Sequence, residues 1–300
     1  MSLLTIFTSP KPFTDPHINT IQRNAIQSWL HLGTEVEVLL VGDEAGMKDV
    51  SDEYGVRQLA EVVCNESGTP LVSSIFSLSH QASQSPLLAY LNADILLLPD
   101  FLEAARQVQV QCEQFLVIGQ RWDLDVPDLM DFSNGWDKRL REDVKRRGDL
   151  HLPAGSDYFL FPRSLFIEMP GFAIGRAGWD NWMIYYARQQ TWPVIDATPS
   201  IMVIHQSHDY SHLPGGKPHY EQEESWTNEA MAGGSANLYM VLDSDKQLID
   251  GKIRRPKMTL MRALRRAEIW FTPPDGTRQG VKWSIARRLR RMRRKLTGSL

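Results

Sequence analysis

The sequence predicts an α/β protein, a three-layer sandwich in which helices cover both faces of a mostly parallel β-sheet. Short apolar runs alternate with segments of helical spacing through the first half of the chain, which is typical of βαβ units. Several of these runs end directly in polar residues, as strands do at the sheet edge where α/β proteins bind ligands. In addition, the stretch after residue 250 is strongly basic and patterned as amphipathic helices, so it is distinct from the sheet-forming part.

The expected elements follow in the order strand, helix, strand. In the first half, we expect strands at 3–7, 36–41, 87–91 and 115–118, and helices at 19–32, 71–81 and 101–112, with a second apolar run at 95–98. The second half is less regular. There we expect a polar helix at 136–147, strands at 158–161 and 200–204, a helix at 180–189, and a long functional loop rich in His, Gly and acids at 206–237.

Length and composition indicate a globular protein. The 300 residues suit one large domain, or one domain with an appendage, and the 42% hydrophobic and 23% charged content is ordinary for such a fold. No stretch approaches the roughly 20 apolar residues of a transmembrane helix. We expect no signal peptide, and the two cysteines, Cys64 and Cys112, lack metal-site spacing, so a reducing cytoplasm is the expected compartment.

The charge is divided unevenly along the chain. Residues 254–300 hold 15 Lys and Arg against two acids, a net charge of +13, whereas residues 1–253 hold the remaining 18 basic and 34 acidic residues, a net charge of −16. We therefore expect a main domain at 1–250 and a basic tail at 251–300 that has an anionic partner of its own.

The most informative motif is the turn Asn92-Ala93-Asp94, which follows the apolar run Leu87–Leu91. A carboxylate beside a buried strand is costly unless it is paired or bound to a metal. Mg²⁺ and Mn²⁺ prefer carboxylate oxygens together with substrate phosphates, so Asp94 is a candidate ligand. The alternative is an ordinary turn, which Asn and Asp favour.

A histidine cluster follows the last expected strand. His205, His208 and His212 fall within eight residues, and neutral imidazole is a common metal ligand. His205 ends a strand as Asp94 does, so the two side chains could face one crevice. We predict that His205 or His208 contacts metal or diphosphate, and that His212 is a solvated loop residue.

These motifs, in their order along the chain, resemble glycosyltransferases of the GT-A type. The resemblance spans residues 3–213 and depends on the segment 3–13 (LLTIFTSPKPF), Asn92-Ala93-Asp94, Gly178-Trp179-Asp180-Asn181 and the histidine cluster. It implies a nucleotide-sugar bound over the first βαβ units, a divalent metal (Mn²⁺ or Mg²⁺) held by an Asp-x-Asp motif and a later His, and, in inverting members, an acid at a helix start as the catalytic base. The chain departs from the pattern at Asn92, which replaces the first acid.

The resemblance assigns roles to particular residues. Asp180 is the expected base, Trp179 and Trp182 are the expected acceptor contacts, and the expected metal ligands are Asp94, His205 and His208. The expected donor-site residues are Thr8, Lys11, Arg23, Gly42, Asp43, Asn92, Ala93, Asp94, Arg121 and Asp157. Ordinary structural roles remain open for several of them: a helix N-cap for Asp180, core packing for the tryptophans, and turn or salt-bridge roles for Asp43, Asp157 and Arg121.

The basic tail has the pattern of an amphipathic helix. Ile285, Leu289, Met292 and Leu296 recur at helical spacing among Lys and Arg, and 259–271 is a milder example. Such helices lie in membrane interfaces. The alternatives are a disordered basic arm or a nucleic-acid contact, but the acidic body would repel a phosphate backbone, so we expect no nucleic-acid partner.

Together these observations predict transfer of a sugar from a nucleoside diphosphate to a hydroxyl of a glycan or lipid-linked acceptor, as in polysaccharide biosynthesis, at the inner face of a membrane. A sugar-phosphate nucleotidyltransferase is the first alternative, but the expected Gly-rich loop after the first strand is absent from 8–12. A metal hydrolase built on the histidines would need more acids paired with them. A non-catalytic nucleotide-sugar-binding protein would explain Asn92.

Overall fold

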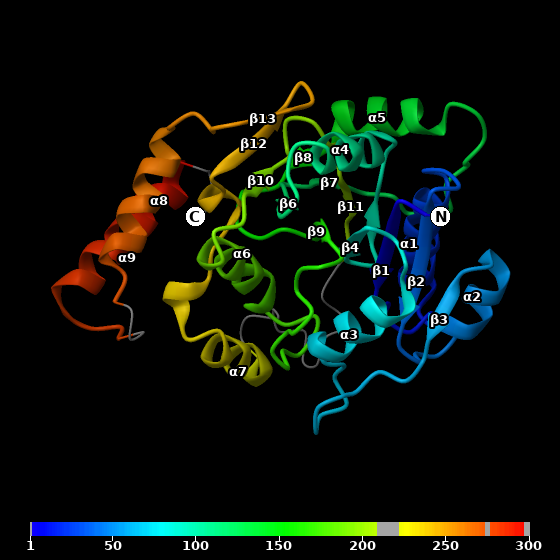
Figure 1. The fold of residues 1–300 in the computed structure, drawn as a ribbon, viewed down its shortest axis with the longest axis horizontal. Coiled ribbons are helices and arrows are strands. Elements are labelled where there is room, and N and C mark those ends of the chain that lie inside the picture. Colours follow the sequence, from blue (N-terminus) through cyan, green and yellow to red (C-terminus); the bar gives the residue numbers. More distant parts are fainter. Residues whose placement is uncertain (1, 209–221, 274–276, 297–300) are drawn as a thin grey trace.

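A nine-stranded sheet lies at the centre of the computed structural model, which describes residues 2–208, 222–273 and 277–296 (Figure 1). The strand order is β13-β12-β10-β6-β9-β4-β1-β2-β3. Strand β9 runs antiparallel to both β4 and β6, and β13 runs antiparallel to β12, whereas the other neighbours are parallel. The prediction of a mixed α/β fold with a large, mostly parallel sheet is confirmed.

The elements closely follow the predicted alternation. The strands of the large sheet are β1 (Leu4–Thr8), β2 (Val36–Val41), β3 (Arg57–Leu59), β4 (Leu87–Leu91), β6 (Leu116–Ile118), β9 (Tyr158–Pro162), β10 (Val194–Asp196), β12 (Lys246–Ile249) and β13 (Lys252–Arg254). The helices are α1 (Pro16–Leu30), α2 (Met47–Tyr54), α3 (Val72–Ala82), α4 (Asp100–Gln109), α5 (Trp136–Arg147), α6 (Trp179–Gln189), α7 (Glu223–Met231), α8 (Leu260–Phe271) and α9 (Gly280–Leu296), with short 3₁₀ turns at Ser235–Asn237 and Val241–Asp243.

Helices cover both faces of the large sheet. Ile6 of β1 packs in a core cluster with Trp29 of α1 and Phe101 of α4. The next residue, Phe7, faces the other side and packs in a second cluster with Phe76 of α3, where the two rings meet edge to face at 5.0 Å. Because both faces are buried, the central strands are continuously apolar, which is why the sequence marks them clearly.

A second, four-stranded sheet lies beside the carboxyl end of β4. Its order is β5 (Ile95–Leu96), β11 (Ile204–Gln206), β7 (Trp122–Leu124) and β8 (Asp149–Leu150). Helix α5 covers it with Trp136, Leu140 and Val144, which pack in a third core cluster. The turn Asn92-Ala93-Asp94 connects β4 of the large sheet directly to β5 of the small one.

Two expected elements differ from the structure. The strand expected at 200–204 is formed by Ile204–Gln206, because Ser200 and Ile201 instead form a turn in which their amides donate to Ala197 O. The loop expected at 206–237 contains helix α7, and its residues 209–221, including His212, lie outside the described part. Helix α7 is held by a polar side chain, Asn228, which bonds both backbone groups of Ala173 at 2.9 and 3.0 Å, so apolar periodicity does not reveal it.

The basic helices α8 and α9 lie side by side, and α8 packs against the 3₁₀ turn Val241–Asp243 (Figure 1). Arg262 of α8 reaches Asp196 at the end of β10, at 3.4 Å. Glu268 of α8 is fully buried and accepts hydrogen bonds from Arg290 and Arg293 of α9, at 2.8 and 3.0 Å. The tail is therefore tied to the sheet by buried ion pairs. Among the helices of the described ranges, none is both long and apolar enough to cross a bilayer.

Candidate active site

The candidate site lies where four segments of the large sheet end at one edge. Strands β1, β4 and β6 have their carboxyl ends here, and β9 begins here because it runs antiparallel between β4 and β6. The register pairs Leu91 with Tyr158, which places Asp157 beside the Asn92 turn. This reversal of one strand brings a polar residue that precedes a strand to the same edge as polar residues that follow strands.

Asp94, His205 and His208 form a cluster whose potential ligand atoms all lie within 4.8 Å of one another. Asp94 Oδ2 is 3.1 Å from His208 Nε2 and 3.7 Å from His205 Nε2. The pairing of β5 with β11 brings the two segments together, and the amide of Gln206 donates to Asp94 O at 3.2 Å. The structure thus joins the three residues that the sequence suggests as ligands.

The Asp94 carboxyl is arranged to carry negative charge. Burial alone would raise its pKa, but His205, His208 and Lys11 together hold that pKa well below its usual range. Its second oxygen, Oδ1, is buried without a hydrogen-bond partner in the described part of the chain. A buried carboxylate with one oxygen near two imidazoles and the other without a donor fits the binding of a divalent cation. Mn²⁺ or Mg²⁺ would be suited if phosphate oxygens complete the shell.

A polar network links this cluster to the end of β4. His205 Nδ1 lies 2.9 Å from Asp123 Oδ1, which also accepts from Arg121 Nε at 2.9 Å. Arg121 in turn donates to Asp157 Oδ1 at 2.7 Å, and the same oxygen accepts from Asn92 Nδ2 at 2.8 Å. An amide at position 92 can donate to the Asp157 carboxylate, whereas a second carboxylate there would be repelled. This hydrogen bond is a physical reason for the departure from Asp-x-Asp.

Asp180 lies in the first turn of α6, and its Oδ1 accepts from the Gly178 amide at 3.3 Å. Its Oδ2 faces Gly155 so closely that a Cβ at this position would lie 2.7 Å away. Burial, reinforced by the nearby Asp157 carboxylate, raises the pKa of Asp180 to about 6 against the opposing backbone hydrogen bonds. A carboxyl group with this pKa is suited to accept a proton near neutral pH.

The three carboxylates converge on one buried tyrosine. Burial raises the pKa of Tyr90 far above its ordinary value, and the charges of Asp94, Asp157 and Asp180 raise it further. Tyr90 OH also lies 3.4 Å from Asn92 Oδ1. The candidate metal ligand Asp94 and the candidate base Asp180 therefore lie on the same side of the sheet edge, near Tyr90.

The other predicted donor residues divide into two groups. Thr8 ends β1 with a buried hydroxyl that has no partner among the described atoms, and Lys11 is near enough to Asp94 to feel its charge, although burial lowers the Lys11 pKa. Arg23, in contrast, is directed to Glu53 at 2.7 Å. Gly42 and Asp43 both accept hydrogen bonds from Gln58, and Ala93 lies in the turn after β4. The predicted acceptor contacts, Trp179 and Trp182, are only 5% and 8% exposed and pack in the second core cluster.

Sequence reasoning missed three polar residues of this region. Asp123 and His151 belong to the network, with His151 Nδ1 2.8 Å from Asp123 Oδ2. Gln206 is fully buried, and its side chain donates to Asp94 O at 3.1 Å and to Ile21 O at 2.7 Å. The signal available in the sequence was a polar Gln within the segment expected to end a strand, beside His205. A side chain at such a position must find hydrogen-bond partners if it is buried.

The chain matches no protein-family model and no curated protein. It is similar to the crystal structure of glucosyl-3-phosphoglycerate synthase from Mycobacterium tuberculosis in complex with Mn²⁺, uridine diphosphate and phosphoglyceric acid, with 15% identity, 86% of this chain and 88% of that chain covered, and a TM-score of 0.48. It is also similar to S. aureus TarS 1-349, with 12% identity, 70% and 58% covered, and a TM-score of 0.40. With identities below 25% and TM-scores below 0.5, these two likenesses assign neither a family nor an activity to this chain.

Proposed function

We propose that this chain is a metal-dependent glycosyltransferase that moves a sugar from a nucleoside diphosphate to a hydroxyl group. The observation that carries the proposal is the placement of the Asp94–His205–His208 cluster on the same sheet edge as a buried carboxyl group whose pKa is about 6. The first of these suits a diphosphate leaving group and the second suits removal of a proton from an acceptor. An inverting transfer that uses a metal to stabilise the diphosphate requires both functions.

Each group has a defined part in the proposed reaction. Asp94, His205 and His208 would hold Mn²⁺ or Mg²⁺, which offsets the negative charge of the departing diphosphate. Asp180 accepts the proton of the acceptor hydroxyl. The oxygen of that hydroxyl bonds to the anomeric carbon of the sugar as the bond from this carbon to the diphosphate breaks, which inverts the configuration. Lys11 supplies positive charge on the β1 side of the site, and Asn92 and Asp157 offer hydrogen bonds to ribose or sugar hydroxyls.

The test is thermal and chemical stability measured with a panel of nucleoside diphosphates and nucleotide-sugars, with and without Mn²⁺. A ligand at about 100 times its dissociation constant stabilises the fold by about 2.7 kcal/mol. We expect one nucleotide to stabilise the chain only with Mn²⁺, and Asp94→Ala to remove that effect. Asp149→Ala, which changes an exposed acid of β8, is the matched control. No stabilisation by any nucleotide would contradict the proposal.

A metal-dependent hydrolase is a second candidate, because the acids needed for it are present. Asp94 pairs with His205 and His208, and Asp123 pairs with His205 and His151. Two imidazoles and one carboxylate also form a common zinc or iron site. Product analysis separates the two functions: water as the only acceptor, with Zn²⁺ or Fe²⁺ preferred, supports hydrolysis, whereas a glycosylated alcohol supports transfer.

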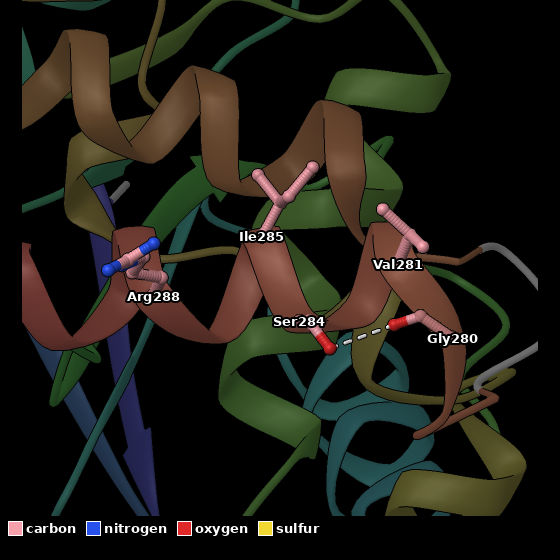
Figure 2. A pocket seen from close by; sticks show the side chains of 5 residues that line it. All are labelled: Gly280, Val281, Ser284, Ile285 and Arg288. Carbon is pink, nitrogen blue, oxygen red and sulfur yellow. Dashed lines mark hydrogen bonds between the residues drawn. The ribbon is translucent and has the colours of Figure 1, made fainter.

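We further propose that the α8–α9 tail docks on an anionic membrane surface, which would bring the site to a lipid-linked acceptor. Helix α9 contains no acid, and its exposed cations are Lys282, Arg287, Arg288, Arg291, Arg294 and Lys295. Exposed apolar side chains accompany them: Trp270 is 81% exposed and Val281 77%. Apolar and cationic side chains also lie together along α9, where Val281, Ile285 and Arg288 line one open pocket (Figure 2).

Vesicle co-sedimentation tests this membrane proposal. We expect binding to phosphatidylglycerol vesicles but not to phosphatidylcholine vesicles, with each cation contributing about 1 kcal/mol. Reversal of Arg287, Arg288 and Arg291 to Glu should abolish binding. Reversal of Lys138, Lys145 and Arg146, three exposed cations of α5, serves as the control and should not. Equal loss in both triple variants would show only a dependence on net charge, and would contradict docking through α9.

A further inference from the structure

Asp123 lies next to His205 because of the register of the small sheet. The parallel pairing of β11 with β7 sets His205 opposite Asp123, and the pairing of β7 with β8 sets Asp123 opposite Asp149. Paired residues on neighbouring strands project to the same face of a sheet. The contact between the imidazole and the carboxylate is therefore built into the strand pairing and does not depend on a flexible loop.

We propose that Asp123 is the positioning residue of the metal cluster, and that it selects the His205 tautomer whose Nε2 lone pair faces Asp94. The proposal rests on the proposed metal site. An ionised carboxylate can only accept hydrogen bonds, so the nitrogen that lies 2.9 Å from it, Nδ1, must carry the hydrogen. In the neutral ring, Nε2 is then left as a lone-pair donor, and it is this atom that lies 3.7 Å from Asp94 Oδ2.

The Asp123 side chain is itself held from two sides. Arg121 Nε donates to Oδ1 at 2.9 Å and His151 Nδ1 lies 2.8 Å from Oδ2, so both oxygens have fixed partners. Arg121 also contacts Asp157 at 2.7 Å, which connects the orientation of His205 to the side of the site where Asn92 lies. Carboxylates that orient metal-binding histidines in this way typically change metal affinity by about 10- to 100-fold when removed.

The first measurement needs no metal. In the ¹⁵N-labelled chain at mildly alkaline pH, NMR shifts of the ring nitrogens report which one carries the hydrogen. We expect His205 to carry it on Nδ1 in the wild type and to become a mixture of tautomers in Asp123→Ala. Asp123→Asn should keep the wild-type tautomer, because its amide oxygen can replace Oδ1. Asp149→Ala, in the same row of the sheet, should change nothing.

The second measurement is Mn²⁺ binding followed by electron paramagnetic resonance. We expect affinity to fall about 10- to 100-fold in Asp123→Ala, less in Asp123→Asn, and not at all in Asp149→Ala. An unchanged tautomer in Asp123→Ala, or unchanged affinity in both Asp123 variants of a chain that binds Mn²⁺, overturns the inference. If Asp123→Ala does not fold, unchanged affinity in Asp123→Asn decides against it. A wild-type chain that binds no Mn²⁺ contradicts the proposed metal site instead, and the tautomer then decides whether Asp123 orients His205.

Discussion

Replacing Asp180 with Asn should make the protein more stable at neutral pH while stopping the proposed reaction. The structure buries this carboxyl group at the start of α6, near Asp157, and its pKa rises to about 6. A raised pKa means that the folded chain binds the proton more tightly than the unfolded chain. The charged form therefore destabilises the fold, and an amide, which never ionises, is free of that cost.

The magnitude follows from the two pKa values. The rise from the ordinary 3.8 to about 6 corresponds to about 3 kcal/mol, at about 1.4 kcal/mol for each pH unit. Below pH 4 the group is protonated in both states and the penalty is absent. The penalty grows between pH 4 and 6 and is complete above pH 6. The stability of Asp180→Asn relative to the wild type should thus be about 3 kcal/mol more favourable at about pH 8 than at about pH 4.

Urea unfolding of both chains across this pH range measures the effect. The measured quantity is the change with pH in the difference between the two unfolding free energies. Any constant effect of replacing the carboxyl group with a carboxamide cancels from it. Asp137→Asn, at another acid in the first turn of a helix, is the matched control for a charge near a helix end. Turnover in Asp180→Asn should fall by about 10²- to 10⁴-fold. A stability difference that stays constant from pH 4 to 8 would refute both the raised pKa and the reasoning that makes Asp180 the base.

Three further predictions follow from single contacts. Asn92→Asp should destabilise the fold by about 1–3 kcal/mol at neutral pH, because it replaces a hydrogen bond to Asp157 with a second carboxylate. Urea unfolding should show that this loss becomes smaller at acidic pH, where the introduced carboxyl group is protonated. Glu268→Gln should weaken the packing of α9 by about 3–5 kcal/mol, since it removes the buried charge that three arginines share, and limited trypsin digestion should cut α9 faster. Gly155→Ala should reduce turnover without unfolding the chain, because its Cβ would lie 2.7 Å from Asp180 Oδ2, and circular dichroism beside an activity assay separates these effects.

The elements that bury continuous apolar runs could be predicted from sequence alone. Leu87–Leu91 is a strand with the predicted bounds, and Trp136–Arg147 is a helix with the predicted bounds. Helix α7 could not be predicted in this way, because Asn228 holds it through hydrogen bonds to a distant backbone. The spacing of apolar residues does not indicate hydrogen bonds between a side chain and a distant backbone segment.

Individual residues of the candidate site could be predicted from the chemistry of their side chains and their neighbours in sequence. Contacts that depend on how the strands pair could not. The sequence suggested that Asp94 and His205 both lie at strand ends, whereas in the structure Asp94 lies in the turn between β4 and β5 and His205 is the middle residue of β11. The pairing of β5 with β11 brings them together. Asp123 lies two residues from Arg121, which the sequence did suggest, yet its contact with His205 depends on which strand pairs with β7 and in what phase. A single sequence does not specify that pairing.

The distance along the chain between the cluster's residues also sets when the site can form. Asp94 and His208 are separated by 114 positions, and Asn24 of α1 is connected to Asp94 through Gln206. Early and late parts of the chain must therefore all be present. During synthesis the first βαβ units can fold while β11 is still inside the ribosome. The nascent chain is thus unable to gather its histidines around Asp94 until the sheet beneath them exists. Binding of a metal at the proposed site would then be one of the last events of folding, and it would report that the small sheet has closed.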